Sequence, residues 1–111
     1  MIKFPWHIEK RVTQVGVGDT ASEPVLLPYE DQNGRVARRI IYTLAPDPVG
    51  SGRVEITFDS PDKVKANSAD LTWIPWPRGN VSVNTVDDSE VATAARVVAV
   101  SGSVKVAIRC V

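Results

Sequence analysis

Short runs that alternate apolar and polar residues follow one another along almost the whole chain. The clearest run is 54–58, where Val54, Ile56 and Phe58 fall on one face and Glu55 and Thr57 on the other. A period of two residues is that of a β-strand with one buried face. Comparable short runs, alternating or simply apolar, occupy residues 8–17, 25–27, 35–44, 71–76, 81–86, 94–100 and 104–111.

Turn-forming residues separate these runs. The chain has eight prolines and seven glycines, and they lie almost wholly between the runs, where turns are expected. Residues 16–20 break the first run, and the Asn33-Gly34 pair is a strong hairpin-turn signal. Only residues 87–95 could form a helical turn. Its acidic start suits a helix N-terminus, but its length and its Thr and Val content are unfavourable.

Many short strands joined by turns predict a β-sandwich or a barrel, and about 100 residues is the usual size of a sandwich. We therefore predict an all-β fold, an antiparallel β-sandwich of the jelly-roll or immunoglobulin-like kind with seven or eight short strands. The chain of 111 residues fits one domain. Within it, residues 1–7 form an apolar N-terminal arm, and residues 8–111 form the single sandwich domain.

The last part of the sequence is the most informative about architecture. Two runs rich in β-branched residues, 94–100 and 104–111, flank the sequence Ser101-Gly102-Ser103. This pattern predicts a β-hairpin. Because the second run continues to the last residue, we expect that end of the chain to be a fixed strand rather than a loose tail.

Composition excludes several classes of function. Thirteen basic residues balance thirteen acidic ones, whereas nucleic-acid binders usually have a basic excess. Arg38 and Arg39 point to opposite faces of a strand and do not form a patch; we expect ion pairs at a sheet edge instead.

No apolar run approaches the roughly 18 residues of a membrane span, and the N-terminus lacks the apolar core of a signal peptide. We expect synthesis in the cytoplasm, with neither nucleic acid nor membrane as a partner.

The residues that carry chemistry are few. His7 and Cys110 are the only histidine and cysteine, and together they cannot supply a zinc site. Residues 50–52 are too short for a nucleophile elbow, and residues 16–18 lack the third glycine of a dinucleotide fingerprint. We predict no enzyme activity, no catalytic residue and no cofactor, and we expect both His7 and Cys110 to be dispensable for function.

Two acidic loops could in principle hold calcium, which prefers oxygen ligands. One contains Asp59 and Asp62, and the other contains Asp87, Asp88 and Glu90. Neither matches the spacing of an EF-hand, and acidic residues are common turn formers. We predict no metal site.

The aromatic residues are the best candidates for a binding surface. Trp73 and Trp76 are three apart, so in a strand they point to opposite faces and only one can lie in the core. Phe4 and Trp6 add two further aromatics in the N-terminal arm, which either packs on its own domain or docks on a neighbour. Tryptophan is enriched where interfaces concentrate their binding energy. We therefore predict a partner interface formed by Phe4, Trp6, Trp73 and Trp76.

Two other interpretations of the tryptophans stay open. One tryptophan could lie in the core and the other beneath a loop, because large side chains are often only partly buried. Alternatively, Trp73 or Trp76 could be the stacking platform of a carbohydrate-binding module. The nearby residues that could then bind sugar hydroxyls are Asn80, Asp70 and Arg78.

The closing segment resembles that of small virion structural proteins of tailed bacteriophages, a group that includes head-decoration (cement) proteins and head or tail fibre modules. The residues that carry this resemblance are Arg96, Val98, Val100, the Ser-Gly-Ser turn, Val104, Val106, Ile108 and Arg109. It implies a non-enzymatic protein in the virion, most simply a capsid decoration protein that stabilises the head by protein–protein contacts. Its partners would be copies of itself, in the simplest case as a trimer, and the major capsid protein or another virion protein.

Overall fold

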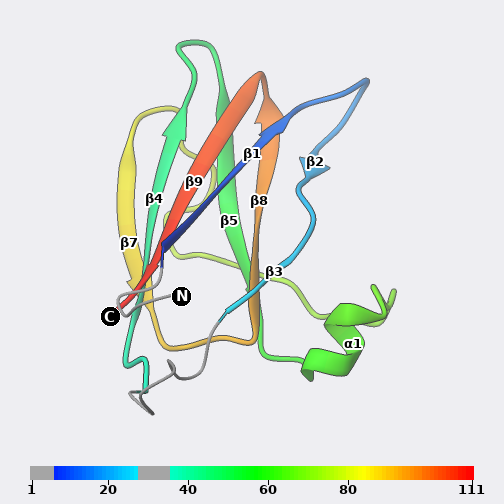
Figure 1. Ribbon diagram of the computed structural model, residues 1–111. Coiled ribbons are helices and arrows are strands. Elements are labelled where there is room, and N and C mark those ends of the chain that lie inside the picture. The colour runs from blue at the N-terminus through cyan, green and yellow to red at the C-terminus, as the bar shows by residue number, and fades with distance from the viewer. Residues whose placement is uncertain (1–6, 28–35) are drawn as a thin grey trace.

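A computed structural model describes residues 7–27 and 36–111 (Figure 1). Two antiparallel sheets lie face to face, and one short helix, α1 (Pro61–Lys65), lies beside them. The first sheet has the order β1 (His7–Thr13), β9 (Ser103–Cys110), β4 (Ile40–Pro46) and β7 (Thr85–Ser89). The second sheet has the order β2 (Thr20–Ala21), β8 (Ala94–Ser101), β5 (Ser51–Thr57) and β6 (Ile74–Pro75), and β3 (Val25–Leu26) pairs farther along β8. The predicted all-β sandwich is confirmed.

The strand pairing is nested, which identifies the kind of sandwich. β1 pairs with β9, β2 and β3 pair with β8, β4 pairs with β7, and β5 pairs with β6. If β2 and β3 count as one interrupted strand, eight strands form two four-stranded sheets. This is the jelly-roll arrangement. An immunoglobulin-like sandwich would place its last two strands in one sheet, whereas β8 and β9 lie in different sheets.

The predicted C-terminal hairpin is wrong for the same reason. β8 pairs with β5, and β9 pairs with β1 and β4. The single residue between β8 and β9 is Gly102, whose φ of +59° is a conformation that favours glycine. It redirects the chain from one sheet to the other. The expectation that residues 104–110 form a fixed strand is confirmed, because β9 lies between β1 and β4.

The core lies between the sheets and is made by the inward-facing residues of each alternating run. Its largest fully buried side chains include Tyr42, Ile40, Leu44, Ile108, Val54 and Val97. The Tyr42 hydroxyl lies 3.0 Å from the Ser89 Oγ atom, which satisfies it inside the sandwich. Burial raises the pKa of Tyr42 to about 12 because the charged phenolate would be poorly solvated there.

Trp76 contributes to the core from the stretch after β6. Its side chain is only 4% exposed. Its backbone N–H donates to the Val54 carbonyl at 2.9 Å, and its indole Nε1–H donates to the Gly79 carbonyl at 2.6 Å. Gly79 has a φ of +64°, so the turn folds back beneath the indole. Trp76 is thus packed against the core, and its one polar atom is satisfied.

Several local elements differ from the prediction. Residues 87–95 form no helix, because residues 85–89 are strand β7. The helix is α1, whose N-cap Ser60 accepts a bond from the Lys63 N–H at 3.3 Å and whose first residue is Pro61. Ser followed by Pro is a helix-start signal. β6 covers only two residues of the predicted 71–76 run, because Pro75 and Pro77 restrict further pairing.

The predicted arm and turn fall largely outside the described residues. Phe4 and Trp6 lie in residues 1–6, and the Asn33-Gly34 turn lies in residues 28–35. His7 was assigned to the arm, but it is the first residue of β1 and pairs with Arg109. Within the described ranges, no helix has the length and apolar character needed to cross a membrane.

Candidate functional site

The two tryptophans near β6 occupy different environments. Trp76 belongs to the core and presents almost no surface to a partner. Trp73 is half-buried and lies over Arg96 of β8, with the Arg96 Cζ atom 4.3 Å from the centre of its ring. The inference that at most one of the two lies in the core is confirmed. Trp73 is therefore the aromatic side chain of this pair that a ligand can reach.

A charged network on the second sheet holds Arg96 in place. Glu55 of β5 is 6% exposed, and its Oε1 atom accepts bonds from the Arg96 Nε and Nη2 atoms at 2.8 and 2.6 Å. Its Oε2 atom accepts a bond from the Arg53 Nε atom at 2.8 Å. Arg53 in turn donates to Asp19 at 3.0 Å and to Asn80 at 3.1 Å. A buried carboxylate requires such partners, and they fix the guanidinium beneath Trp73.

Burial and pairing act in opposite directions on the pKa of Arg53. Burial lowers the pKa, because the charged guanidinium loses solvent. The bonds to Glu55 and Asp19 raise it, and the net effect is an increase above the ordinary value. Arg53 therefore remains charged and acts as a fixed part of the network.

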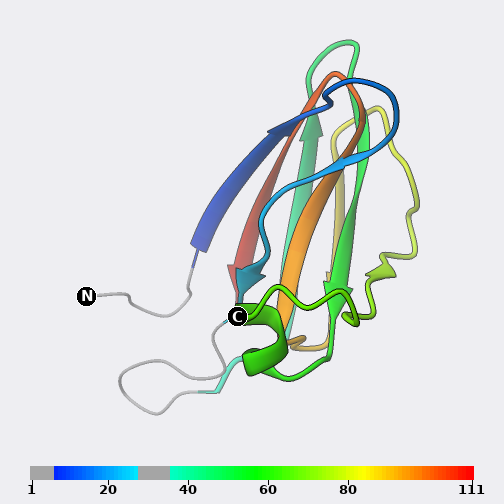
Figure 2. The ribbon, with the colours of Figure 1, turned by 90° about the vertical axis from the view of Figure 1, so that its right-hand side faces the viewer.

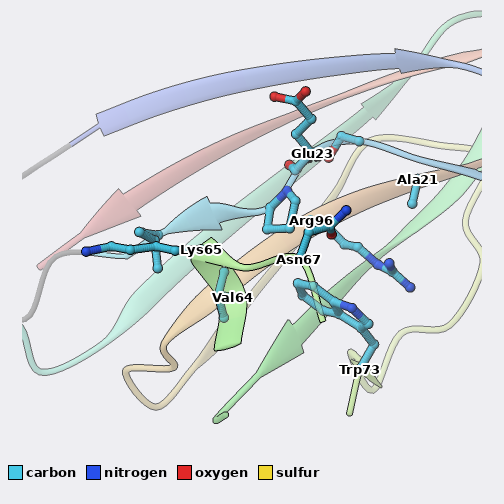
Figure 3. Close-up of a pocket in the computed structure, with 10 residues that line it drawn as sticks. Ala21, Glu23, Val64, Lys65, Asn67, Trp73 and Arg96 are labelled. Carbon is cyan, nitrogen blue, oxygen red and sulfur yellow. Dashed lines mark hydrogen bonds between the residues drawn. The ribbon is translucent and has the colours of Figure 1, made fainter. Parts of the chain in front are cut away.

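A cleft of about 550 Å³ lies beside the Trp73–Arg96 pair (Figure 3). Its walls come from the stretch between β2 and β3, from α1 and the turn after it, and from β8. We call it the Trp73 cleft. Its polar and aromatic lining residues are Ser22, Glu23, Lys65, Asn67, Trp73 and Arg96, and its aliphatic lining residues are Ala21, Pro24, Leu26 and Val64.

Two of these polar residues also have local structural roles. The Ser22 Oγ atom accepts a bond from the Val97 N–H at 3.0 Å and donates to the Glu23 carbonyl at 3.1 Å, so its bonding capacity is largely used. Asn67 follows α1 with a φ of +52°, a conformation in which asparagine is one of the tolerated residues. The polar groups left to a ligand are the Glu23 carboxylate, the Lys65 ammonium, the Asn67 amide and the remaining N–H groups of Arg96.

A second surface lies at the end of the sandwich opposite α1, where the β1–β2, β4–β5, β6–β7 and β8–β9 loops all lie (Figures 1 and 2). Four valines in these loops are exposed: Val15 (72%), Val17 (106%), Val49 (85%) and Val83 (69%). We call this surface the valine end. Exposed valines are common on protein surfaces, and these four come from three loops at the same end of the molecule.

Backbone hydrogen bonds tie these loops together. The Gln14 N–H donates to the Gly102 carbonyl at 2.8 Å, and the Asp47 N–H donates to the Ser103 carbonyl at 2.9 Å. Gly52 and Val81 exchange two bonds of 3.0 and 2.8 Å. The valine end is therefore built on loops that hold each other in position.

The other candidate residues are occupied in ordinary structural roles. His7 is exposed, with its Nε2 atom 4.0 Å from the Glu9 Oε1 atom. Cys110 is buried, and burial raises the pKa of its thiol to about 11. A thiol with such a pKa is a poor nucleophile at neutral pH.

The acidic loops are also engaged within the protein. The Asp59 Oδ2 atom accepts bonds from the Thr72 N–H at 2.6 Å and the Thr57 hydroxyl at 3.0 Å. These bonds hold the pKa of Asp59 below its ordinary value. Asp88 pairs with Arg39 at 3.0 Å. In the part of the chain that the structure describes, no three His, Cys, Asp or Glu side chains form a metal-binding group.

The Arg39–Asp88 pair confirms the expected ion pairing for Arg39. Asp88 lies on β7, the edge strand of the first sheet, whereas β4, which follows Arg39, lies between β9 and β7. The residues proposed to bind sugar beside the tryptophans also lie elsewhere. Asn80 bonds to Arg53, and Arg78 pairs with Asp87 at 3.4 Å. Asp70 does not line the Trp73 cleft either.

Three residues that complete the cleft carry no signal in the sequence. Glu23, Lys65 and Asn67 lie far from Trp73 in the sequence, and only the packing of the β2–β3 stretch and α1 over β8 brings them together. No local motif predicts that packing. Comparisons with protein-family models, with curated proteins and with solved structures found no match.

Proposed function

We propose that this protein is a non-enzymatic structural subunit of a virion, most simply a capsid decoration (cement) protein that stabilises the head through protein–protein contacts. The observation that carries the proposal is the valine end, where three loops expose four valines. Burying a valine side chain stabilises a complex by about 1.5 kcal/mol or more. A surface that leaves four of them in water favours a partner that covers them.

The construction of the valine end supports this role. Its loops are joined by backbone hydrogen bonds, including those between Gln14 and Gly102 and between Gly52 and Val81. The salt bridge from Arg11 to Asp47, at 3.0 Å, adds a further connection. A surface that is ordered before binding loses little conformational entropy when a partner docks. Rigid apolar contacts of this kind suit a permanent lattice position.

The fold is compatible with the proposal by analogy. Jelly rolls occur in viral capsid proteins and also in lectin domains, so the fold alone does not assign a function. The partners we propose are copies of this chain, in the simplest case as a symmetric trimer, and the major capsid protein. Phe4 and Trp6, which lie outside the described residues, and the half-buried Trp73 stay candidate contacts. Trp76 is buried within the chain and is not included.

The decisive experiment is binding to undecorated heads assembled from the major capsid protein encoded nearest to this chain. Co-sedimentation should show saturable binding of the parent protein, and the heads should resist heating better with it than without it. Changing both Val17→Asp and Val49→Asp should abolish binding, because charged groups would replace the apolar contacts.

A matched control is Val36→Asp. Val36 precedes β4, at the end of that strand opposite the β4–β5 loop, and is 46% exposed, so the same chemical change there should leave binding intact. Absence of binding by the parent protein would overturn the proposal. Equal binding by the double variant and the parent would show that the valine end is not the contact surface.

A further inference from the structure

We infer that the Trp73 cleft is a saccharide-binding site that holds one or two neutral pyranose rings against Trp73. This inference does not depend on the proposed function. Val64 and Lys65 of α1 line the cleft, and α1 lies at the end of the sandwich opposite the loops of the valine end (Figures 1 and 2). A decoration protein could carry both surfaces, since one would face the particle and the other would stay free.

The aromatic wall of the cleft is ordered before any ligand arrives. Trp73 lies against the Arg96 guanidinium at 4.3 Å, and Glu55 fixes that guanidinium with two hydrogen bonds. One edge and face of a pyranose ring consist of C–H groups, which pack well on an indole. A fixed ring of this size offers a large contact area at little cost in side-chain entropy.

The polar groups around the cleft match the needs of sugar hydroxyls. A hydroxyl both donates and accepts hydrogen bonds. Glu23 supplies an acceptor, Lys65 supplies donors, and the Asn67 amide supplies both. Arg96 uses its Nε and Nη2 atoms on Glu55 and retains further N–H groups, with 27% of its side chain exposed. In Figure 3, Glu23 and Lys65 lie on different sides from Trp73, and their charged ends extend outward, away from the Trp73 ring, which places these two residues at the rim of the cleft.

The charge balance favours a neutral ligand. Within the lining, Glu23 offsets Lys65, and the Arg96 charge is already paired with buried Glu55. A phosphate or sulfate group would therefore meet no unbalanced cluster of positive charge and would lie near a carboxylate. The volume of about 550 Å³ falls within the range of roughly 300–1,000 Å³ that is typical of small-molecule sites. A cleft of this size accommodates a short saccharide.

The test is a titration of the whole protein with neutral oligosaccharides, namely cello-, malto-, xylo-, manno- and N-acetylglucosamine oligomers, with inorganic phosphate as the anionic probe. Binding is measured by calorimetry and by the change in tryptophan fluorescence. At least one neutral oligosaccharide should bind with a Kd tighter than about 1 mM. The Trp73→Ala variant should weaken that binding by about tenfold or more, whereas Trp73→Phe, which keeps an aromatic ring, should lose much less.

Two further variants keep the test decisive. Glu23→Gln and Lys65→Ala alter the rim without touching the core, so they bear on the inference even if Trp73→Ala fails to fold. Each should weaken binding by roughly two- to tenfold, the usual worth of one hydrogen bond. The Val17→Asp and Val49→Asp double variant should bind sugar as the parent does, which separates this site from the valine end.

The inference is overturned if no oligosaccharide of the panel binds more tightly than about 1 mM. It is also overturned if phosphate binds and the sugars do not. Sugar binding that is unchanged in a folded Trp73→Ala variant, or unchanged in both rim variants, would place the ligand elsewhere on the molecule.

Discussion

Replacement of Trp76 by alanine should destabilise the fold rather than remove a partner contact. The indole is 4% exposed and packs with the residues of the core. Its Nε1–H group donates to the Gly79 carbonyl at 2.6 Å. Removing a buried aromatic side chain costs about 3–5 kcal/mol, from lost burial and the cavity that remains. A small domain has a total stability of about 5–15 kcal/mol, so Trp76→Ala should lose about a fifth of it or more.

The Trp76→Phe variant divides that cost into parts. Phenylalanine keeps an apolar ring but cannot donate to the Gly79 carbonyl, so it should lose the hydrogen bond, worth about 1 kcal/mol, and some packing. We expect about 2 kcal/mol in total. The matched comparison is Trp73→Ala on the outside of the second sheet, where the side chain is half-buried. That change should cost less than Trp76→Ala.

Urea unfolding followed by far-UV circular dichroism measures these differences, because fluorescence itself changes when a tryptophan is removed. The transition midpoint should fall in the order parent, Trp76→Phe, Trp76→Ala, with the slope of the transition unchanged. If the free energy of unfolding of Trp76→Ala lies within about 1 kcal/mol of the parent value, the indole does not stabilise the core. A contact role for Trp76 would then become the better explanation.

Three further changes test other parts of the structure. Glu55→Gln should cost roughly 3 kcal/mol by urea unfolding, because it leaves Arg53 and Arg96 without their shared carboxylate; a cost below about 1 kcal/mol would contradict the network. Gly52→Ala should cost about 3 kcal/mol or more, because the added Cβ would collide with the Val98 carbonyl in the neighbouring strand; a folded variant of parental stability would refute that packing. Because burial raises the pKa of Cys110, its contribution to the free energy of unfolding is complete below about pH 9 and declines as the pH rises toward 11, by on the order of 1 kcal/mol at pH 10. Cys110→Ala should flatten this decline. An unchanged dependence of stability on alkaline pH in that variant would contradict the role of Cys110.

The alternation of apolar and polar residues was enough to predict the sandwich. Residues 54–58 show the period of two, residues 94–100 are a short apolar run, and β5 and β8 cover most of both segments. Strand partners could not be predicted in the same way. A run such as 104–110 buries alternate residues whether it pairs with β8 or packs against β8 from the opposite sheet. The sequence therefore contained the strands but not the jelly-roll pairing.

The candidate site was only partly predictable. Trp73 was identified from its side-chain type and its distance from Trp76, because strand geometry allows only one of the two to face the core. Glu23, Lys65 and Asn67 were not identified, since they reach the cleft through the path of the β2–β3 stretch and α1. Glu55 was assigned to a polar face by alternation, but its burial depends on Trp73 and two arginines. Contacts between residues so distant in the sequence leave no local sequence pattern.

The pairing of β1 with β9 determines when the first sheet can form. His7 lies opposite Arg109, and Thr13 lies opposite Ser103, so β1 pairs with a strand about 90 residues later in the chain. β4 also pairs only with later strands, β7 and β9. On the ribosome the first sheet must therefore wait until β9 has emerged. Pairing of residues so distant in the sequence is slow, on a scale of milliseconds to seconds. Until then β1 and β4 have unpaired edges that could bind other nascent chains.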